Sequence, residues 1–362
     1  MSAHEIVIAV MAAFALLGAG DRLLGNRLGL GREFEAGIQS MGPLMMAMAG
    51  IITLAPVLAS VLKPVVVPLY AFLGADPAMF AGTILACDMG GGALALELTE
   101  DYEAAMLGGV LTGSMLGATL VFTIPIALGI LREEDRPCMA QGILCGIITI
   151  PLGVLAGGLA AGFALGKILR NILPIVLMGA LIAIGLWRAE KTMVRGFTLF
   201  GKLILCVSTL GLGLGIAQSL TGIRLLPNMA PMETVFSTVG SIAIVLSGAF
   251  VAVAVLTRLL RRPLTALGRK LDMNETAAAG LIASLANSIA MFEMVRDMDR
   301  RGKVVNIAFA VSAAFVLGDH LGFTAGFAPE MLPAVILGKL TGGVSAGALA
   351  WWMAGKQVRK SA

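Results

Sequence analysis

The chain has 362 residues, of which 58% are hydrophobic and 13% are charged, and its formal net charge is +4. A soluble domain of this composition would expose apolar side chains to water over most of its surface. The charged residues stand in short stretches between long apolar blocks, so the positive charge is typical of membrane-protein loops and gives no sign of nucleic-acid binding. No polar stretch is long enough to form a separate soluble domain.

Long apolar blocks recur along the chain, and about 20 residues suffice for a helix to cross the hydrocarbon core. Six of them are Ile6–Gly20, Met41–Leu62, Ala104–Leu131, Met139–Gly166, Val235–Thr257 and Met331–Gly355. The first block lacks a basic leader and a small-residue cleavage site, so we expect a retained helix and not a signal peptide. These blocks predict an all-α polytopic membrane protein with about 9–11 transmembrane elements.

The distribution of Lys and Arg predicts which stretches face the cytoplasm, where these residues are enriched. It places the C-terminal tail, with Lys356, Arg359 and Lys360, in the cytoplasm and the N-terminus outside. The other basic stretches assigned to the cytoplasm are 22–32, 132–136, 188–195, 258–270 and 296–303. The stretches assigned to the outside are 100–103, 167–171 and those around 227 and 329–330.

Two apolar segments are short for a membrane span and polar or glycine-rich at the middle. Ala277–Glu293 lies between two basic stretches assigned to the same side. Ala81–Leu98 follows a stretch, 64–77, that its prolines are expected to break. We expect both segments to be re-entrant or broken, which is tolerated only where protein shields the backbone or a wet cavity adjoins it.

The two short segments also resemble each other. AGTILACDMGGGALALELTED begins at Ala81 and AGLIASLANSIAMFEMVRD begins at Ala279, and each ends with two carboxylates four residues apart. Because the charge pattern orients the copies oppositely, we predict an inverted 5+5 repeat. Its parts are 1–171 as the first repeat, 172–195 as a linking helix and loop, and 196–362 as the second repeat. The alternative is that any two Gly/Ala-rich helices look alike.

Small residues at a spacing of four predict faces of close helix packing. Such runs are Gly109, Gly113 and Gly117; Gly158, Gly162 and Gly166; and Gly338, Gly342 and Ala346. We expect these faces to contact neighbouring helices within one chain or in a homodimer.

Asp88 is the first candidate site residue, because ionisable groups inside a membrane are costly and usually functional. It stands before three glycines, Gly91 at their centre, which leave the backbone accessible to a ligand. A carboxylate beside exposed carbonyl groups suits a small cation. The alternative is an Asp that only caps loose amides at the break.

Asp319 and His320 lie deep in the apolar run AFVLGDHLGFTAGF. A buried Asp–His pair can bind a cation or relay protons, since His titrates near neutral pH. The alternative is a structural pair at a helix break marked by Gly318 and Gly322.

The second short segment carries Ser284, Asn287 and Ser288, which at helical spacing form one polar face suited to a hydroxyl group. The alternative is hydrogen bonding between helices without a ligand. Glu97 and Glu293 end the two segments, either in the site or as solvated helix termini.

Enzyme motifs are weak in this sequence. GFTLFGKL, from Gly196, fails the phosphate-binding pattern because Leu203 stands where Ser or Thr must hold magnesium. Two histidines are too few for common multi-histidine metal sites, and we expect no metal or cofactor. The Tyr and Trp residues offer no cage for a quaternary ammonium, so a primary ammonium fits better.

ETAAAGLIASLANSIAMFEMVRDMDRRGKVVNIAFAVSAAFVLGDHLGFTAG, from Glu275 to Gly326, resembles the ethanolamine utilisation transporter family EutH. ACDMGGGALA from Ala86 and QSMGPLMMAMAGII from Gln39 resemble it too, and the likeness runs over essentially the whole chain. The resemblance implies a permease of the bacterial cytoplasmic (inner) membrane that facilitates ethanolamine uptake. A cobalamin-dependent ethanolamine ammonia-lyase is then its pathway partner, and no cofactor is bound to this chain.

Ethanolamine fits the residues derived above, since Asp88 or Asp319 could bind its ammonium and Asn287 or Ser288 its hydroxyl. The alternative function is a proton- or sodium-coupled transporter of another small polar or cationic solute. The sequence is compatible with channel-like diffusion and with alternating access. A membrane-embedded enzyme lacks clustered ligands or a nucleophile–base pair.

Overall fold

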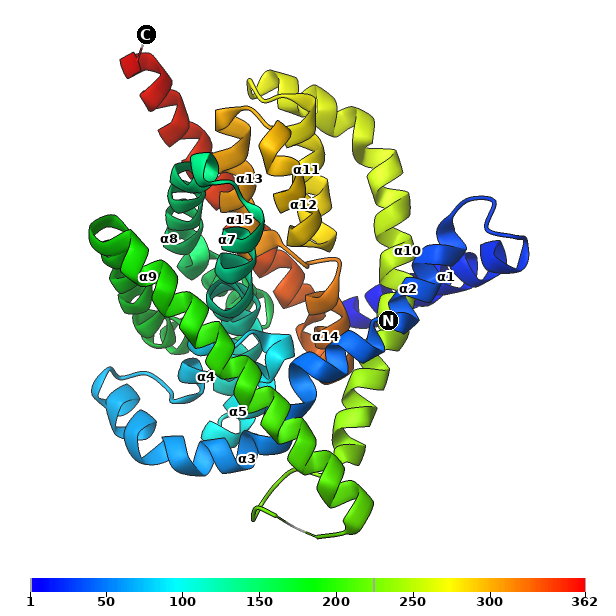
Figure 1. The fold of residues 1–362 in the computed structure, drawn as a ribbon, viewed down its shortest axis with the longest axis vertical. Coiled ribbons are helices and arrows are strands. Elements are labelled where there is room, and N and C mark those ends of the chain that lie inside the picture. Colours follow the sequence, from blue (N-terminus) through cyan, green and yellow to red (C-terminus); the bar gives the residue numbers. More distant parts are fainter. Residues whose placement is uncertain (1, 224, 362) are drawn as a thin grey trace.

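A computed structural model describes residues 2–223 and 225–361, and within them all regular structure is helical (Figure 1). Eight helices in this part of the chain are long and apolar enough to cross a membrane. They are Ala3–Leu23, Leu30–Phe72, Tyr102–Ile130, Glu133–Ala160, Leu165–Gly185, Arg195–Thr221, Met232–Leu259 and Pro329–Gly355. The structure also contains shorter, interrupted helices. The protein is a multi-pass membrane protein.

Three helices form the N-terminal part: α1 (Ala3–Leu23), α2 (Leu30–Gln39) and α3 (Met41–Phe72). The carboxylate of Asp21 accepts backbone hydrogen bonds from Leu28, Leu30 and Gly31, which holds the turn between α1 and α2. The predicted break over 64–77 is wrong in its position, because α3 continues through its prolines as far as Phe72. Neighbouring helices can satisfy the carbonyl groups that prolines leave free in a membrane helix.

Two long helices flank the broken ones, as Figure 1 shows for α9 in green and α10 in yellow-green. They are α9 (Leu165–Thr221), divided by a kink at Ala189 (φ −145°, ψ 47°), and α10 (Met232–Lys270). The basic stretches 188–195 and 258–270 therefore lie within long helices, the first of them at the kink of α9. Lys and Arg are good helix formers, so a helix can extend beyond the apolar block. The side chains of Lys356, Arg359 and Lys360 lie outside the described residues.

The first short segment is interrupted, as predicted. It consists of α4 (Ala78–Ile84), a single 3-10 turn η1 (Cys87–Met89) and α5 (Gly91–Leu98). Leu85 and Ala86 are extended, and Gly90 has φ 90°, a conformation that glycine adopts without strain.

The second short segment is interrupted too, and a third interruption follows it. Asn287, with extended backbone (φ −155°, ψ 126°), separates α11 (Glu275–Ala286) from α12 (Ser288–Met294). Residues 314–318 separate α13 (Arg300–Ala313) from α14 (Asp319–Phe327). Figure 1 shows α4 and α5 toward one end of the molecule and α11 and α12 toward the other.

The remaining elements connect these parts. They are α6 (Tyr102–Ala105), the π-helical η2 (Met106–Gly117) and η3 (Thr119–Thr123), α7 (Ile124–Ile130), α8 (Arg136–Ala160), α15 (Leu332–Ser361) and the 3-10 turns η4 (Glu133–Asp135), η5 (Val295–Asp297) and η6 (Pro329–Met331).

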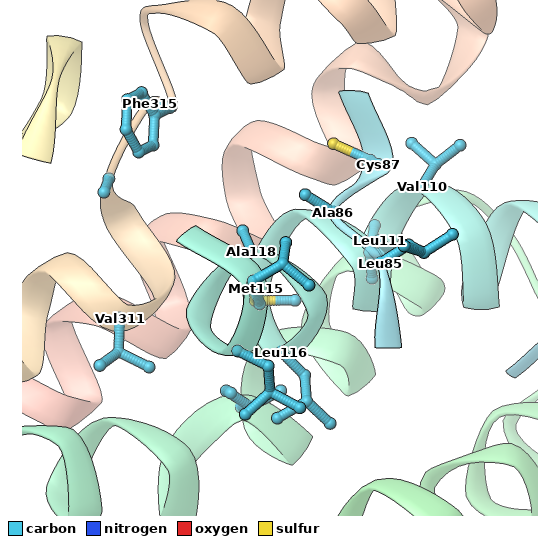
Figure 2. Close-up of a cluster of buried hydrophobic side chains, with 14 of the residues drawn as sticks. Leu85, Ala86, Cys87, Val110, Leu111, Met115, Leu116, Ala118, Val311 and Phe315 are labelled. Atoms are coloured by element: carbon cyan, nitrogen blue, oxygen red, sulfur yellow. The ribbon is translucent and has the colours of Figure 1, made fainter. Parts of the chain in front are cut away.

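Residues from later elements of the chain cover the breaks at Leu85 and Asn287. Figure 2 shows the stretch Leu85–Cys87 beside the segment that carries Val110, Met115 and Ala118. A Cβ at Gly117 would lie 1.9 Å from the Leu85 carbonyl oxygen, so only glycine permits this approach. In the second half, the amides of Phe315 and Leu317 donate to the carbonyls of Ser284 and Leu285 at 3.1 and 2.9 Å.

The glycine runs serve packing within the chain, with one correction. Gly109, Gly113 and Gly117 contact the first broken segment. Where α8 meets α15, Gly153 and Gly157 lie against Gly338 and its neighbours. Gly162 and Gly166, which were predicted to extend this face, have nothing within 4 Å, because α8 ends at Ala160 and the chain turns there. The packed glycines of these runs therefore serve contacts between helices of the same chain.

Polar contacts gather at two ends of the molecule. At one end, Lys167 pairs with Asp101 and Glu103 at 2.8 and 2.7 Å, and Tyr102 donates to Glu330. The hydrogen bond from Lys167 holds the pKa of Asp101 below its usual value.

The other end joins the basic stretches. Lys303 pairs with Asp135 at 2.5 Å, and Arg301 pairs with Asp272 at 3.1 Å. The Trp351 indole N–H donates to the Leu271 carbonyl at 2.9 Å, which ties the end of α15 to this group. The two groups of contacts match the two sets of stretches that the charge pattern separates.

The glycine contact between α3 and α9 can be tested with a matched pair of substitutions. A Cβ at Gly50 would lie 1.6 Å from the Ser208 carbonyl oxygen, whereas Gly213 has nothing within 4 Å. Gly50→Ala should lower the free energy of unfolding by about 1–3 kcal/mol, because the helices must separate. Gly213→Ala should raise it by about 0.4–1 kcal/mol through the entropy of the unfolded chain. Thermal unfolding in detergent measures both, and equal effects would contradict this packing.

Candidate functional site

A cavity of about 260 Å³ lies where two of the breaks approach the joint between α2 and α3. It is lined mainly by apolar side chains, with four polar or charged groups among them. The lining residues are Ser40, Pro43, Leu44, Ala47, Ala86, Asp88, Met89, Ala118, Phe122, Phe315, Asp319 and His320. Three residues predicted from the sequence, Asp88, Asp319 and His320, are thus brought together from opposite halves of the chain.

Asp88 enters the cavity from the short turn that follows the first break. One carboxylate oxygen, Oδ1, lies 3.7 Å from Nε2 of His320, and their side chains are 15% and 4% exposed. Gly91 does not line the cavity. Its amide donates to the Ala86 carbonyl at 3.0 Å, and a Cβ there would lie 2.7 Å from the same oxygen, so glycine closes the turn.

Asp319 and His320 form the first turn of α14, directly after the third break. A negative charge in the first turn of a helix is stabilised by the helix dipole. The Nδ1 atom of His320 is buried without a hydrogen-bond partner in the described part of the chain. A buried unpaired nitrogen is costly, so this atom could accept from or donate to a ligand.

Two phenylalanines supply aromatic walls that the Tyr and Trp content did not suggest. The ring centroids of Phe122 and Phe315 lie 5.4 Å apart at a steep angle, and Phe315 lies 5.2 Å from His320. Phe315 has φ 63°, a left-handed conformation that is strained for a bulky residue. Such strain is found mostly at functional sites, and aromatic faces attract cations.

Ser284, Asn287 and Ser288 do not line this cavity. Asn287 is exposed, and its side chain accepts from the Ile289 amide at 2.8 Å, which caps α12. Ser284 is buried and donates to the Leu281 carbonyl, and Ser288 is buried on the following helix. The predicted polar face assumed helical spacing, which is lost where the chain is extended at Asn287.

Glu97 and Glu293 lie away from the cavity. Both are exposed, and Glu293 lines a separate pocket near Arg132 and Arg296. Their positions at the ends of α5 and α12 match the alternative of solvated helix termini.

A second cavity, of about 460 Å³, adjoins the first through a shared residue. Asp319 lines both cavities, and Glu33, Asn287 and Arg258 line the second one. Asp319 is half-buried, so its carboxylate can be approached from either cavity.

Sequence reasoning missed two polar residues, Lys339 and Ser40. Lys339 of α15 is 1% exposed, and its Nζ donates to the Ser114 carbonyl at 2.5 Å. A lone lysine inside the apolar block Met331–Gly355 was a signal that could have found it. Ser40 lines the cavity and donates to the Gly37 carbonyl at 2.6 Å. No local signal distinguishes this serine from many others.

Cys87, Asp88 and His320 have ligand atoms within 4.8 Å of one another. Sulfur, oxygen and nitrogen donors of this kind can hold a metal such as zinc. The ammonium of Lys339 interacts electrostatically with both Cys87 and Asp88. A fixed positive charge at this position disfavours a divalent cation and is compatible with a singly charged one.

Comparison with known proteins assigns the family. A family model described as "Ethanolamine utilisation protein, EutH" matches residues 3–353. A "Probable ethanolamine permease EutH" of Listeria monocytogenes is 55% identical over 100% of this chain and 97% of its own length. An "Uncharacterized protein YxeR" of Bacillus subtilis is 51% identical over 99% and 97%, and a "Probable ethanolamine permease EutH" of Escherichia coli K12 is 44% identical over 99% and 97%. No solved structure matches. The chain belongs to the EutH family of ethanolamine utilisation proteins.

Proposed function

We propose that this protein is a transporter, not an enzyme, and that it carries ethanolamine across the membrane through the cavity that holds Asp88, Asp319 and His320. The observation that carries the proposal is the meeting of two carboxylates and a histidine at helix breaks inside a membrane protein. Ionisable groups at such positions mark solute pathways. The names of two of the relatives compared above favour ethanolamine over another solute.

The chemistry of ethanolamine matches the groups in the cavity. Its amine, similar to that of lysine, is protonated at neutral pH, and a carboxylate binds an ammonium through charge-assisted hydrogen bonds. Its hydroxyl can bond to Nδ1 of His320 or to Ser40, which take the role first expected of Asn287 and Ser288. The two carbons would lie against Phe122 and Phe315.

The two halves of the chain form an inverted repeat in this proposal. In each half a broken helix is followed by an element that covers the break: η2 covers Leu85, and the stretch 315–318 covers Ser284 and Leu285. The close contact of α8 with α15 joins the last long helix of one half to that of the other. Such repeats place the substrate near the middle of the membrane.

The sidedness follows from charge. The end that holds Lys303, Asp135 and Arg301 faces the cytoplasm of a bacterial cell, with the C-terminus, because it gathers the basic stretches. Ethanolamine would thus be delivered to a cytoplasmic enzyme such as an ethanolamine ammonia-lyase. A homodimer would have to form through lipid-facing side chains, since the packed glycines are used within the chain.

Uptake of labelled ethanolamine into proteoliposomes tests the site. Asp88→Asn and Asp319→Asn should each reduce kcat/KM for uptake by roughly 10- to 100-fold. Each substitution removes either a charge-assisted hydrogen bond to the ammonium or a negative charge that balances it. Glu97→Gln and Glu293→Gln remove carboxylates outside the cavity and should transport like the wild type. Normal uptake by both Asp variants would reject the site.

Cysteine labelling in intact cells tests the sidedness. In a Cys206→Ser background, a membrane-impermeant maleimide should label Glu100→Cys but not Glu134→Cys, because the two exposed residues lie at opposite ends. Both should react after permeabilisation. The reverse pattern in intact cells would invert the proposed topology.

A further inference from the structure

Lys339 is a fully buried cation to which the proposed transport function assigns no role. It lies in α15, is 1% exposed, and stands within a segment long and apolar enough to cross the membrane. An ammonium in such surroundings is stable only when it is paired and hydrogen-bonded. Its partners therefore show what this charge does in the site.

The partners of Lys339 lead directly to Asp88. Its Nζ donates to the carbonyl of Ser114 at 2.5 Å, and an ammonium has two further donors. A Cβ at Gly113, the residue before Ser114, would lie 3.1 Å from the Cys87 amide nitrogen. Asp88 follows Cys87, and Lys339 interacts electrostatically with both residues and with His320. The lysine thus lies behind the Asp88 turn and supplies it with a positive charge.

Asp319 occupies a different position. It lines both the central cavity and the adjoining second cavity, so its carboxylate is accessible to a solute in either one. No ion pair within 4 Å joins Asp319 to a cation in the described part of the chain, although Arg258 lines the same second cavity. Asp319 is therefore the carboxylate that both cavities leave open to a solute.

The net charge of these groups supports the same assignment of different roles to Asp88 and Asp319. With both carboxylates ionised and His320 neutral, Asp88, Asp319 and the adjoining Lys339 together carry a net charge of −1. A buried net charge is costly, and one ethanolammonium ion would neutralise it. We propose that Lys339 is the fixed counter-ion of Asp88 and that Asp319 binds the ammonium of the substrate, an inference that rests on the proposed function.

Equilibrium binding of labelled ethanolamine to purified protein tests this division. Asp88→Asn should weaken binding by roughly 10- to 100-fold, because the lysine is left unpaired and repels the ammonium. Adding Lys339→Met should recover most of that loss. Asp319→Asn should lose binding whether or not Lys339→Met is present. Lys167→Met removes a lysine outside the cavity and should not rescue Asp88→Asn.

Thermal unfolding of the same variants gives a second readout. Asp88→Asn and Lys339→Met should each lower the unfolding temperature, since each leaves one buried charge unpaired, and the double variant should be more stable than either. A folded double variant that binds as weakly as Asp88→Asn, or an Asp319→Asn variant that binds like the wild type, would overturn the proposal. Wild-type protein that binds no ethanolamine would reject the proposed function, while the unfolding temperatures would still decide the pairing of Lys339 with Asp88.

Discussion

A helix that is interrupted inside a lipid bilayer leaves amide and carbonyl groups that water cannot reach. Each such group without a hydrogen bond raises the free energy of the folded protein by roughly several kcal/mol. Among residues 2–223 and 225–361, helices are interrupted in this way three times, and the surrounding chain satisfies or shields the breaks. The break at Leu85 is enclosed by a glycine face of η2. The two later breaks satisfy each other, since the amides of Phe315 and Leu317 donate to carbonyls at the end of α11.

The charged groups of the cavity depend on these breaks. A carboxylate on an unbroken apolar helix would face lipid or a packed neighbour. Asp88 instead stands in a short 3-10 turn and Asp319 at the start of α14, and both line the same cavity. Lys339 adds the opposite charge from the helix packed behind η2. The arrangement holds polar groups in an apolar enclosure of about 260 Å³, which suits a small cation that must be recognised and then released.

Part of the site could be predicted from the residues, and part could not. Asp88, Asp319 and His320 stand out because an ionisable residue in an apolar run is conspicuous in the sequence itself. The polar face of Ser284, Asn287 and Ser288 was wrong for a physical reason, since an extended residue changes the direction of every side chain that follows it. Glycine spacing likewise predicts a packing face only while the helix continues, and α8 ends before Gly162.

The sequence by itself determined the membrane class, the family, the interruption of both short segments and the presence of buried acids. These are local properties, readable from composition, from glycine and proline positions and from charges within apolar runs. Only the tertiary structure decided that Asp88 meets His320, that Asp319 lies between two cavities and that Lys339 stands behind the Asp88 turn. These residues lie far apart along the chain, and the distance between them depends on how whole helices pack, which no local pattern encodes.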